Sequence, residues 1–329
     1  MPSLIETQRN ALVRMRAEEI PRGATIPLEL IKKSLYSSLG FIIDAGCGVG
    51  KSVSLGKEGY AVVGLDLNQA AISEAKSKGM EAFESDVTMI GIPGDPYRSL
   101  ILVERASGVL AEGLLCNLVE TQPERFFQVT DFYLTPEGYL FIADILQPSE
   151  DIDFLRERLS EEKADALVEN WKRRYRANEE SGLPYGTFVV AKLGLDKGQE
   201  WGEVGQLQIL MDSANFERYA RHYTRAEIRT LASEVDLKEK YFTPTIFYSR
   251  TGEPLLGFLA AYQKTERYRY HPLYKGMTFR EKAFAGELSN EERRMMEGGP
   301  ECLRIWARKL GENLAVWEDI FPSLKDLIR

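Results

Sequence analysis

The feature that most constrains the fold is the run Phe41-Ile42-Ile43-Asp44-Ala45-Gly46-Cys47-Gly48-Val49-Gly50. An apolar stretch passes directly into Asp-x-Gly-x-Gly-x-Gly, and a helix is expected from residue 51. This order predicts a buried strand, a tight turn and a helix N-terminus. Because glycine adopts positive φ angles and carries no side chain, a ligand can approach the backbone of such a turn closely. The run therefore predicts a nucleoside-binding loop.

The spacing of these glycines differs from the dinucleotide-binding pattern G-x-G-x-x-G. That pattern would need a glycine at Lys51 or at Val53, and neither position has one. The loop is thus not predicted to bind NAD.

Residues 44–50 resemble the first motif of the class I S-adenosylmethionine (SAM) methyltransferases. Further segments resemble the later motifs of this family in the same order, and they are 61–68, 81–87, 107–118 and 134–144. An ordered series of this kind is far more specific than one glycine-rich loop. The resemblance implies an α/β fold with a doubly wound, mostly parallel sheet and an antiparallel last strand.

The resemblance also implies a site for SAM, with S-adenosylhomocysteine as the product. Asp66, at the tip of the second strand, would accept hydrogen bonds from the two ribose hydroxyls. Asp86 would accept one from the adenine amino group, and Asp44 would orient the loop. Taken singly, Asp66 could equally cap the following helix, and Asp86 could be a turn residue. The full set of expected cofactor contacts is Asp44, Gly46, Cys47, Gly48, Gly50, Asp66, Leu67, Asp86, Val87 and Glu112.

The catalytic candidates are His222, Tyr223 and Glu112. Methyl transfer from a sulfonium needs alignment and a desolvated pocket, and a base helps when the acceptor loses a proton. His222 titrates near neutrality, so it is the preferred base. The alternative is a histidine that holds a loop by hydrogen bonds. Glu112 would contact the methionine amino group, act as a base, or be a partly exposed rim acid.

The candidates for acceptor binding are Asn117, Trp171, Arg174 and Tyr175. The last three share one face of an expected helix, which could cover an aromatic or anionic acceptor. Packing of the two aromatic residues on the core is the favoured alternative. Families that methylate exocyclic amines of bases often carry Asn-Pro-Pro-Tyr where residues 116–119 read Cys-Asn-Leu-Val. That branch is therefore not favoured.

Composition places the chain among ordinary globular enzymes, with 44% hydrophobic and 28% charged residues. No apolar stretch approaches the roughly 20 residues that span a bilayer, and residues 1–10 lack the pattern of a secretory signal. Three widely spaced cysteines and two histidines predict neither disulfides nor a metal site. We therefore expect a cytoplasmic protein without membrane contact. A net charge of −8 disfavours a broad nucleic-acid surface.

Five segments follow from the pattern along the chain. They are a helical N-terminal segment (1–40), a SAM-binding core (41–146), a substrate lid inserted after the fifth strand (147–215), the remainder of the core (216–264) and a helical C-terminal extension (265–329). The lid is expected at the carboxyl edge of the sheet, where open α/β folds bind ligands. The C-terminal extension is expected either to pack on the core or to form a homodimer contact.

These observations predict a SAM-dependent methyltransferase that acts on a small molecule, with the acceptor atom undefined. The alternatives are a transferase that moves the aminocarboxypropyl group of SAM, and a non-catalytic partner subunit with a SAM-binding fold.

Overall fold

The computed structural model describes residues 4–14, 25–35, 41–89, 106–180, 182–191, 216–235, 237–248 and 254–265. The predicted C-terminal extension lies outside these residues except for Thr265. Its proposed role in a dimer therefore stays a prediction.

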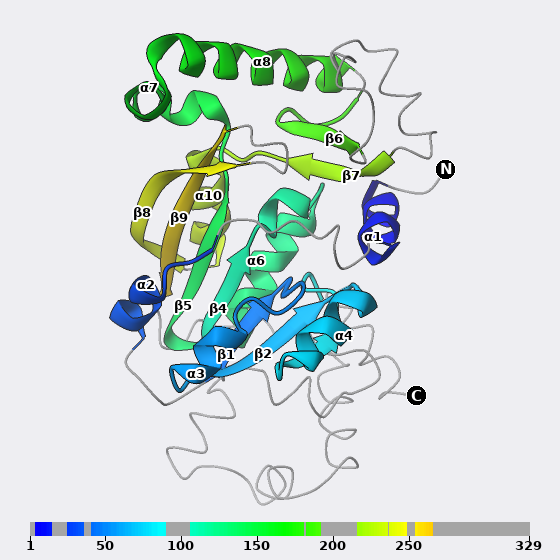
Figure 1. Cartoon of the computed structure of the whole chain (residues 1–329), viewed down its shortest axis with the longest axis vertical. Helices are drawn as coiled ribbons and strands as arrows, with labels where there is room; N and C mark the ends of the chain where they lie inside the picture. Colours follow the sequence, from blue (N-terminus) through cyan, green and yellow to red (C-terminus); the bar gives the residue numbers. More distant parts are fainter. Residues whose placement is uncertain are drawn as a thin grey trace, which may run out of the picture.

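The core is a seven-stranded sheet in the order β3-β2-β1-β4-β5-β9-β8 (Figure 1). Its strands are β1 (Phe41–Ala45), β2 (Ala61–Asp66), β3 (Glu81–Glu84), β4 (Ala106–Glu112), β5 (Leu134–Ile145), β8 (Leu237–Tyr248) and β9 (Pro254–Lys264). The first five strands pair in parallel, whereas β9 runs antiparallel to both β5 and β8. The predicted mostly parallel sheet with an antiparallel last strand is confirmed.

Both faces of this sheet are covered, which explains why its central strands are almost continuously apolar. Alternate residues of a strand point to opposite faces. Ile43 thus packs with α6 (Gln122–Tyr133) and α10 (Arg225–Glu234) in the main core cluster. Its neighbour Ile42 packs on the other face, where α2 (Leu28–Ser34) and α3 (Val53–Lys57) contribute. On this same face of the sheet, Ile72 and Ala75 of α4 (Gln69–Ser77) form a smaller apolar cluster with Cys47 of the glycine loop.

The helix α10 begins with a capping box. Thr224 accepts a hydrogen bond from the Glu227 N–H at 3.1 Å, and the Glu227 carboxylate accepts one from the Thr224 N–H at 2.7 Å. This capping box satisfies two of the four backbone N–H groups that a helix leaves unpaired at its N-terminus. The cap fixes the point at which the chain returns to the core after the insert.

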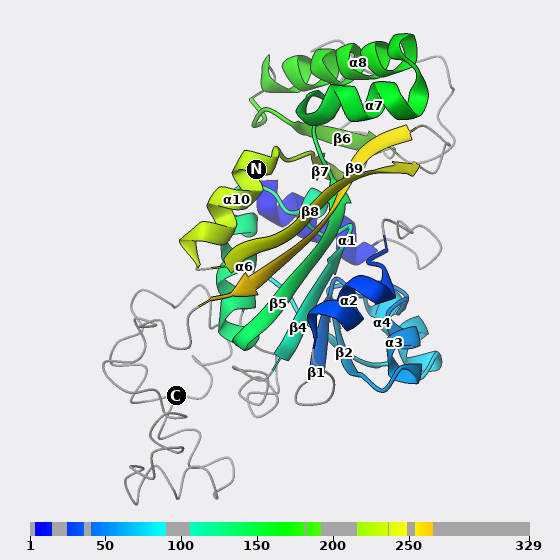
Figure 2. The same cartoon turned by 90° about the vertical axis from the view of Figure 1, so that its left-hand side faces the viewer.

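The described part of the insert after β5 forms two α-helices and a small sheet. It comprises η3 (Pro148–Asp151), α7 (Ile152–Leu159), α8 (Glu161–Glu180) and the antiparallel pair β6 (Thr187–Ala191) and β7 (Phe216–Arg221). Figures 1 and 2 both show these elements at the end of the sheet towards which β5 runs. β7 lies wholly beyond the expected boundary at residue 215, whereas its partner β6 lies before it, so the small sheet spans this boundary. The domain boundaries stay predictions.

The described parts of the N-terminal segment are helical, as predicted. α2 buries Ile31 against the core. In contrast, α1 (Leu4–Arg14) lies beside β7 near the carboxyl edge of the sheet (Figure 1).

Candidate functional site

A cleft opens at the carboxyl ends of β1, β2 and β4, beneath α1. Its cavity has a volume of about 110 Å³ and opens to solvent at its mouth. Eight of the sequence-predicted residues line it, namely Gly46, Gly48, Asp66, Leu67, Asp86, Val87, Glu112 and Asn117. The other lining residues are Arg9, Leu12, Asn68, Ser85, Gly113, Leu114, Leu118 and Gln122.

The glycine loop forms one wall of the cleft in the conformation that its sequence predicts. Gly46, Gly48 and Gly50 have φ angles of 69°, 52° and 76°, in the left-handed region that favours glycine. A Cβ atom at Gly46 would lie 2.9 Å from Leu114 Cδ1, across the cleft wall. The Gly46 N–H donates to the Leu65 carbonyl at 2.7 Å, which ties the loop to the end of β2. A side chain at Gly46 would therefore meet both backbone strain and a steric clash.

Asp66 joins the glycine loop to the end of β2. Its Oδ2 accepts a hydrogen bond from the Gly48 N–H, and its Oδ1 accepts one from the Asn68 N–H, both at 2.8 Å. Desolvation raises the pKa of this carboxyl, and the backbone donors oppose the rise. Each carboxylate oxygen has a second lone pair, so Asp66 can still accept from a ligand in the cleft.

Asp86 lies at the neighbouring strand end. Its Oδ1 accepts hydrogen bonds from the Thr88 N–H at 2.9 Å and from the Thr88 hydroxyl at 2.6 Å. Its Oδ2 lies 4.0 Å from an Arg9 guanidinium nitrogen of α1. The Ser85 N–H donates to the Asp66 carbonyl at 2.8 Å, which fixes the two acids on adjacent strand ends.

Asp44, Cys47 and Gly50 support the loop and do not line the cleft. The buried Asp44 carboxylate accepts a short hydrogen bond from the Ser52 hydroxyl at the start of α3. Burial is the main cause that raises the pKa of Asp44 to about 7. The hydrogen bond from Ser52 lowers this pKa, whereas the nearby charges of Glu112 and Asp66 raise it. The role expected for Asp44, orienting the loop, stays a prediction. Direct cofactor contacts by these three residues stay predictions.

Glu112 lines the cleft at the end of β4. Its Oε1 accepts a hydrogen bond at 2.7 Å from the Ile26 N–H, just before α2. Desolvation raises the pKa of Glu112, whereas the Ile26 N–H and the charge of Lys51 lower it. Asn117 also lines the cleft, from η2 (Leu115–Asn117), and its side-chain amide donates to the Gly113 carbonyl at 2.7 Å.

His222 lies outside the cleft lining, in an aromatic cluster at the base of the insert. Its Nδ1 is 2.6 Å from the Tyr175 hydroxyl, and its ring centroid is 4.6 Å from that of Trp171 and 4.7 Å from that of Phe188. Burial, and secondarily the charge of Arg174, lower the pKa of His222 to about 3. These contacts match the alternative of a histidine that holds a loop. Its role as a base stays a prediction.

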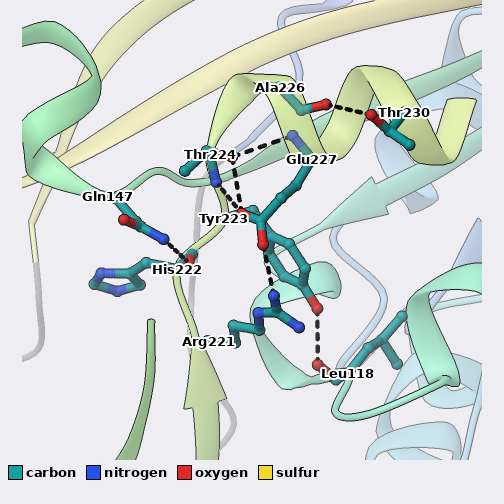
Figure 3. Close-up of polar contacts among 9 residues, drawn as sticks. All are labelled: Leu118, Gln147, Arg221, His222, Tyr223, Thr224, Ala226, Glu227 and Thr230. Atoms are coloured by element: carbon teal, nitrogen blue, oxygen red, sulfur yellow. Dashed lines mark hydrogen bonds and ion pairs between the residues drawn. The ribbon is translucent and has the colours of Figure 1, made fainter. Parts of the chain in front are cut away.

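Tyr223 supports a wall of the cleft from behind. Its hydroxyl donates to the carbonyl of the lining residue Leu118 at 2.9 Å (Figure 3). Burial raises the pKa of Tyr223, and the Arg221 guanidinium lies 4.8 Å from its ring centroid. The hydrogen bond from Tyr223 thus holds Leu118 in the cleft wall. A direct catalytic role for Tyr223 stays a prediction.

Trp171 and Tyr175 are buried on the inner face of α8, as the favoured packing alternative expects. The Trp171 ring centroid lies 4.9 Å from that of Phe188, and the Arg174 guanidinium lies 4.7 Å from the Trp171 ring centroid. None of the three lines the cleft. Their roles in acceptor binding stay predictions.

Within the described ranges, no group of three or more His, Cys, Asp or Glu side chains is arranged to hold a metal ion. Over the same ranges, no helix combines the length and the apolar character that crossing a bilayer requires.

Comparison with known proteins adds one sequence relative and a set of structural neighbours. No family model matches the chain. The 18S rRNA (guanine-N(7))-methyltransferase bud23 of Schizosaccharomyces pombe is 30% identical over 95 residues, which are 27% of this chain. The match covers 35% of that relative's length.

Among solved structures, a SAM-dependent methyltransferase from Methanosarcina mazei superposes with a TM-score of 0.54 at 19% identity. The superposition covers 73% of this chain and 99% of that protein. Together with the strand order and the positive-φ glycine loop, this similarity shows that the chain has the Rossmann-like fold of the class I SAM-dependent methyltransferases.

Proposed function

We propose that the protein is a SAM-dependent methyltransferase that acts on a small-molecule acceptor. The observation that carries this proposal is the convergence of the glycine loop, Asp66 and Asp86 on one cleft. These residues come from three neighbouring strand ends, and each has the hydrogen-bonding capacity that one part of a nucleoside requires. Bound SAM would supply a methyl group on a positively charged sulfur.

The charge of the cleft supports a cationic cofactor. Glu112 and Asp66 both line it, and Asp44 lies close enough to both for their charges to raise its pKa. Because desolvated carboxylates repel one another, a ligand with a sulfonium and an ammonium group would relieve this repulsion. We assign Asp66 to the ribose hydroxyls, Asp86 to the adenine amino group and Glu112 to the ammonium group.

The position of the insert supports a small acceptor. Its helices and small sheet stand at the carboxyl edge of the sheet, where they can enclose a molecule beside the cleft. Enclosure excludes water, and methyl transfer to an aligned acceptor benefits from a dry pocket. The net charge of −8 gives a nucleic acid little general attraction.

Calorimetric titration with S-adenosylhomocysteine tests the cofactor assignment. The wild type should bind, and Asp66→Ala should weaken binding about 100-fold or more, because two hydrogen bonds to a charged group are lost. Glu162→Ala, which removes an exposed carboxylate of α8, serves as the control. Failure of the wild type to bind would refute the proposal.

Product analysis tests the reaction itself. S-adenosylhomocysteine marks methyl transfer, whereas methylthioadenosine marks transfer of the aminocarboxypropyl group. Cofactor binding without either product, together with co-purification of a catalytic partner, would instead favour the non-catalytic partner subunit.

An RNA acceptor is a second candidate, supported by the 30% identity with an 18S rRNA methyltransferase. Incubation with radiolabelled SAM and either total RNA or a small-molecule extract distinguishes the two. Label in the RNA fraction alone would replace the small-molecule proposal.

A further inference from the structure

The helix α1 covers the cleft although it contributes almost nothing to the apolar core. Of its residues, only Gln8 is buried, and none of the core clusters in the described part of the chain includes a residue of α1. An isolated helix of 11 residues is marginal in water. The position of α1 therefore depends on a small number of specific contacts.

Gln8 makes the main contact through a fully buried side-chain amide. Its Nε2 donates to the Asn117 carbonyl at 2.7 Å and to the Tyr219 carbonyl at 2.9 Å, and its Oε1 accepts from the Tyr219 N–H at 2.8 Å. One amide thus pairs both backbone groups of a residue on β7 and one carbonyl of the cleft wall. All three partners are backbone groups, which water would satisfy if α1 moved away.

A second contact holds the other end of the helix. The Asn68 side chain donates to the Leu12 carbonyl at 2.9 Å, one of the carbonyls that the last turn of α1 leaves without an intrahelical partner. Asn68 lies two residues after Asp66, at the end of β2, and its N–H donates to the Asp66 carboxylate. The helix therefore bridges the cleft from the β2 side to the η2 side.

Between these two contacts α1 presents Arg9 and Leu12 to the cleft. They lie three residues apart, on neighbouring positions of one helix face. Arg9 reaches towards Asp86 at 4.0 Å, at the end of the cleft assigned to the adenine. A ligand in the cleft would thus be covered by these two side chains.

The insert, in contrast, is fixed to the core where it leaves and re-enters. Leu146 and Tyr223 form a parallel bridge, and the Gln147 N–H donates to the Tyr223 carbonyl at 3.0 Å. The Gln147 side-chain amide donates to the His222 carbonyl at 3.3 Å (Figure 3). Helices α7 and α8 also bury apolar residues in the main core cluster. Access to the cleft is therefore more easily gained by displacing α1 than by displacing the insert.

We propose that α1 is a latch that retains the cofactor, and that Gln8 is the positioning residue that closes it. The proposal rests on the proposed function, since it takes the cleft as the SAM site. Gln8 also ties α1 to β7 of the insert. Closing the latch over the cofactor thereby fixes Asn117 on the cleft wall and β7 in the same step.

The test measures association and dissociation rates of S-adenosylhomocysteine by surface plasmon resonance on the full chain. Gln8→Ala removes three hydrogen bonds, each worth roughly fivefold in an equilibrium constant, so dissociation should become at least about tenfold faster. Association should be as fast or faster, because the cleft is open for more of the time. Asn10→Ala removes an exposed amide from the same helix and should match the wild type.

Gln8→Glu separates hydrogen bonding from shape. The carboxylate has nearly the same size, but it cannot donate to the two carbonyls and would be repelled by them. It should therefore release the ligand at least as fast as Gln8→Ala. Thermal unfolding of each variant checks that the core is intact.

Hydrogen–deuterium exchange on the wild type provides a measurement that needs no variant. Ligand should slow exchange in residues 4–14 more than in α10. Absence of ligand binding to the wild type would refute the proposed function rather than the latch alone. If the wild type binds, dissociation from Gln8→Ala within twofold of the wild type would overturn the latch. Wild-type dissociation from Gln8→Glu, or no ligand effect on exchange in residues 4–14, would also overturn it.

Discussion

From the burial of His222 we predict how the unfolding free energy depends on pH. The side chain is 1% exposed, and its Nδ1 is hydrogen-bonded to the Tyr175 hydroxyl at 2.6 Å. Its folded-state pKa of about 3 lies well below the ordinary value of 6.5. In the unfolded chain the ring therefore gains a proton as the pH falls through 6.5, whereas in the folded protein it stays neutral until about pH 3. Stability from this group is present above pH 6.5 and is lost as the pH falls.

The magnitude follows from the two pKa values. From pH 6.5 to pH 5 the unfolded state binds the additional proton over about 1.5 pH units, which corresponds to about 2 kcal/mol of lost unfolding free energy. Asp44 and Asp144 act in the opposite direction, because burial raises their pKa values to about 7 and about 6. The pH dependence of the wild type alone therefore does not isolate His222.

The comparison that isolates it uses urea unfolding of the wild type and His222→Gln at pH 7 and pH 5. Between these pH values the wild type should lose about 2 kcal/mol more than the variant. The chain has one other histidine, His271, which lies outside the described residues, so His271→Gln is the matched control. If His222→Gln parallels the wild type, the imidazole is accessible to protons in the folded state. That result would show that burial does not keep the His222 ring neutral, and His222 could then act as a base near neutral pH.

Three further substitutions test the cleft and its support. Gly46→Ala should weaken S-adenosylhomocysteine binding at least tenfold on the calorimetric scale, because the new Cβ meets Leu114 at a positive φ angle. Asp44→Asn should remove one contribution to the pH dependence of stability. Burial raises the folded-state pKa of Asp44 to about 7, so ionisation of this carboxyl destabilises the folded protein. As the pH rises from 5.5 to 7, the wild type should therefore lose about 2 kcal/mol more unfolding free energy than the variant. Tyr223→Phe should cost about 1–3 kcal/mol in urea unfolding, because the Leu118 carbonyl loses its donor in a buried site; an unchanged midpoint would show that this hydrogen bond does not support the cleft wall.

The arrangement of the glycine loop, Asp66 and Asp86 along the cleft was predictable because its determinants are local in sequence. Positive φ at Gly46 and Gly48 is encoded by the residue type itself. Asp66 ends β2, and Asp86 follows the end of the adjacent parallel strand β3 by two residues. The carboxyl ends of such strands meet at one edge of the sheet. An apolar run, a turn and an acid are enough to predict where these side chains lie.

The environment of His222 was not predictable in the same way. Residue type indicates a group that titrates near neutrality, but the pKa depends on which side chains surround it. The ring of His222 is contacted by Trp171 and Tyr175 from α8 and by Phe188 from β6. The positions of these residues in the sequence do not show that they meet a histidine. A tertiary contact has changed the chemistry expected from the residue.

The helix α1 forms one side of the cleft although its sequence carries no recognisable motif. The Gln8 amide bonds to backbone groups of Asn117 and Tyr219, which lie 109 and 211 positions away in the sequence. Backbone groups are present at every residue, so the partners leave no signature in side-chain identity. Only the burial of a lone glutamine on an otherwise exposed or half-buried helix distinguishes the contact. A core with the class I SAM-dependent methyltransferase fold can thus hold an N-terminal helix through two side-chain amides, those of Gln8 and Asn68, and the helix becomes recognisable only when the chain is folded.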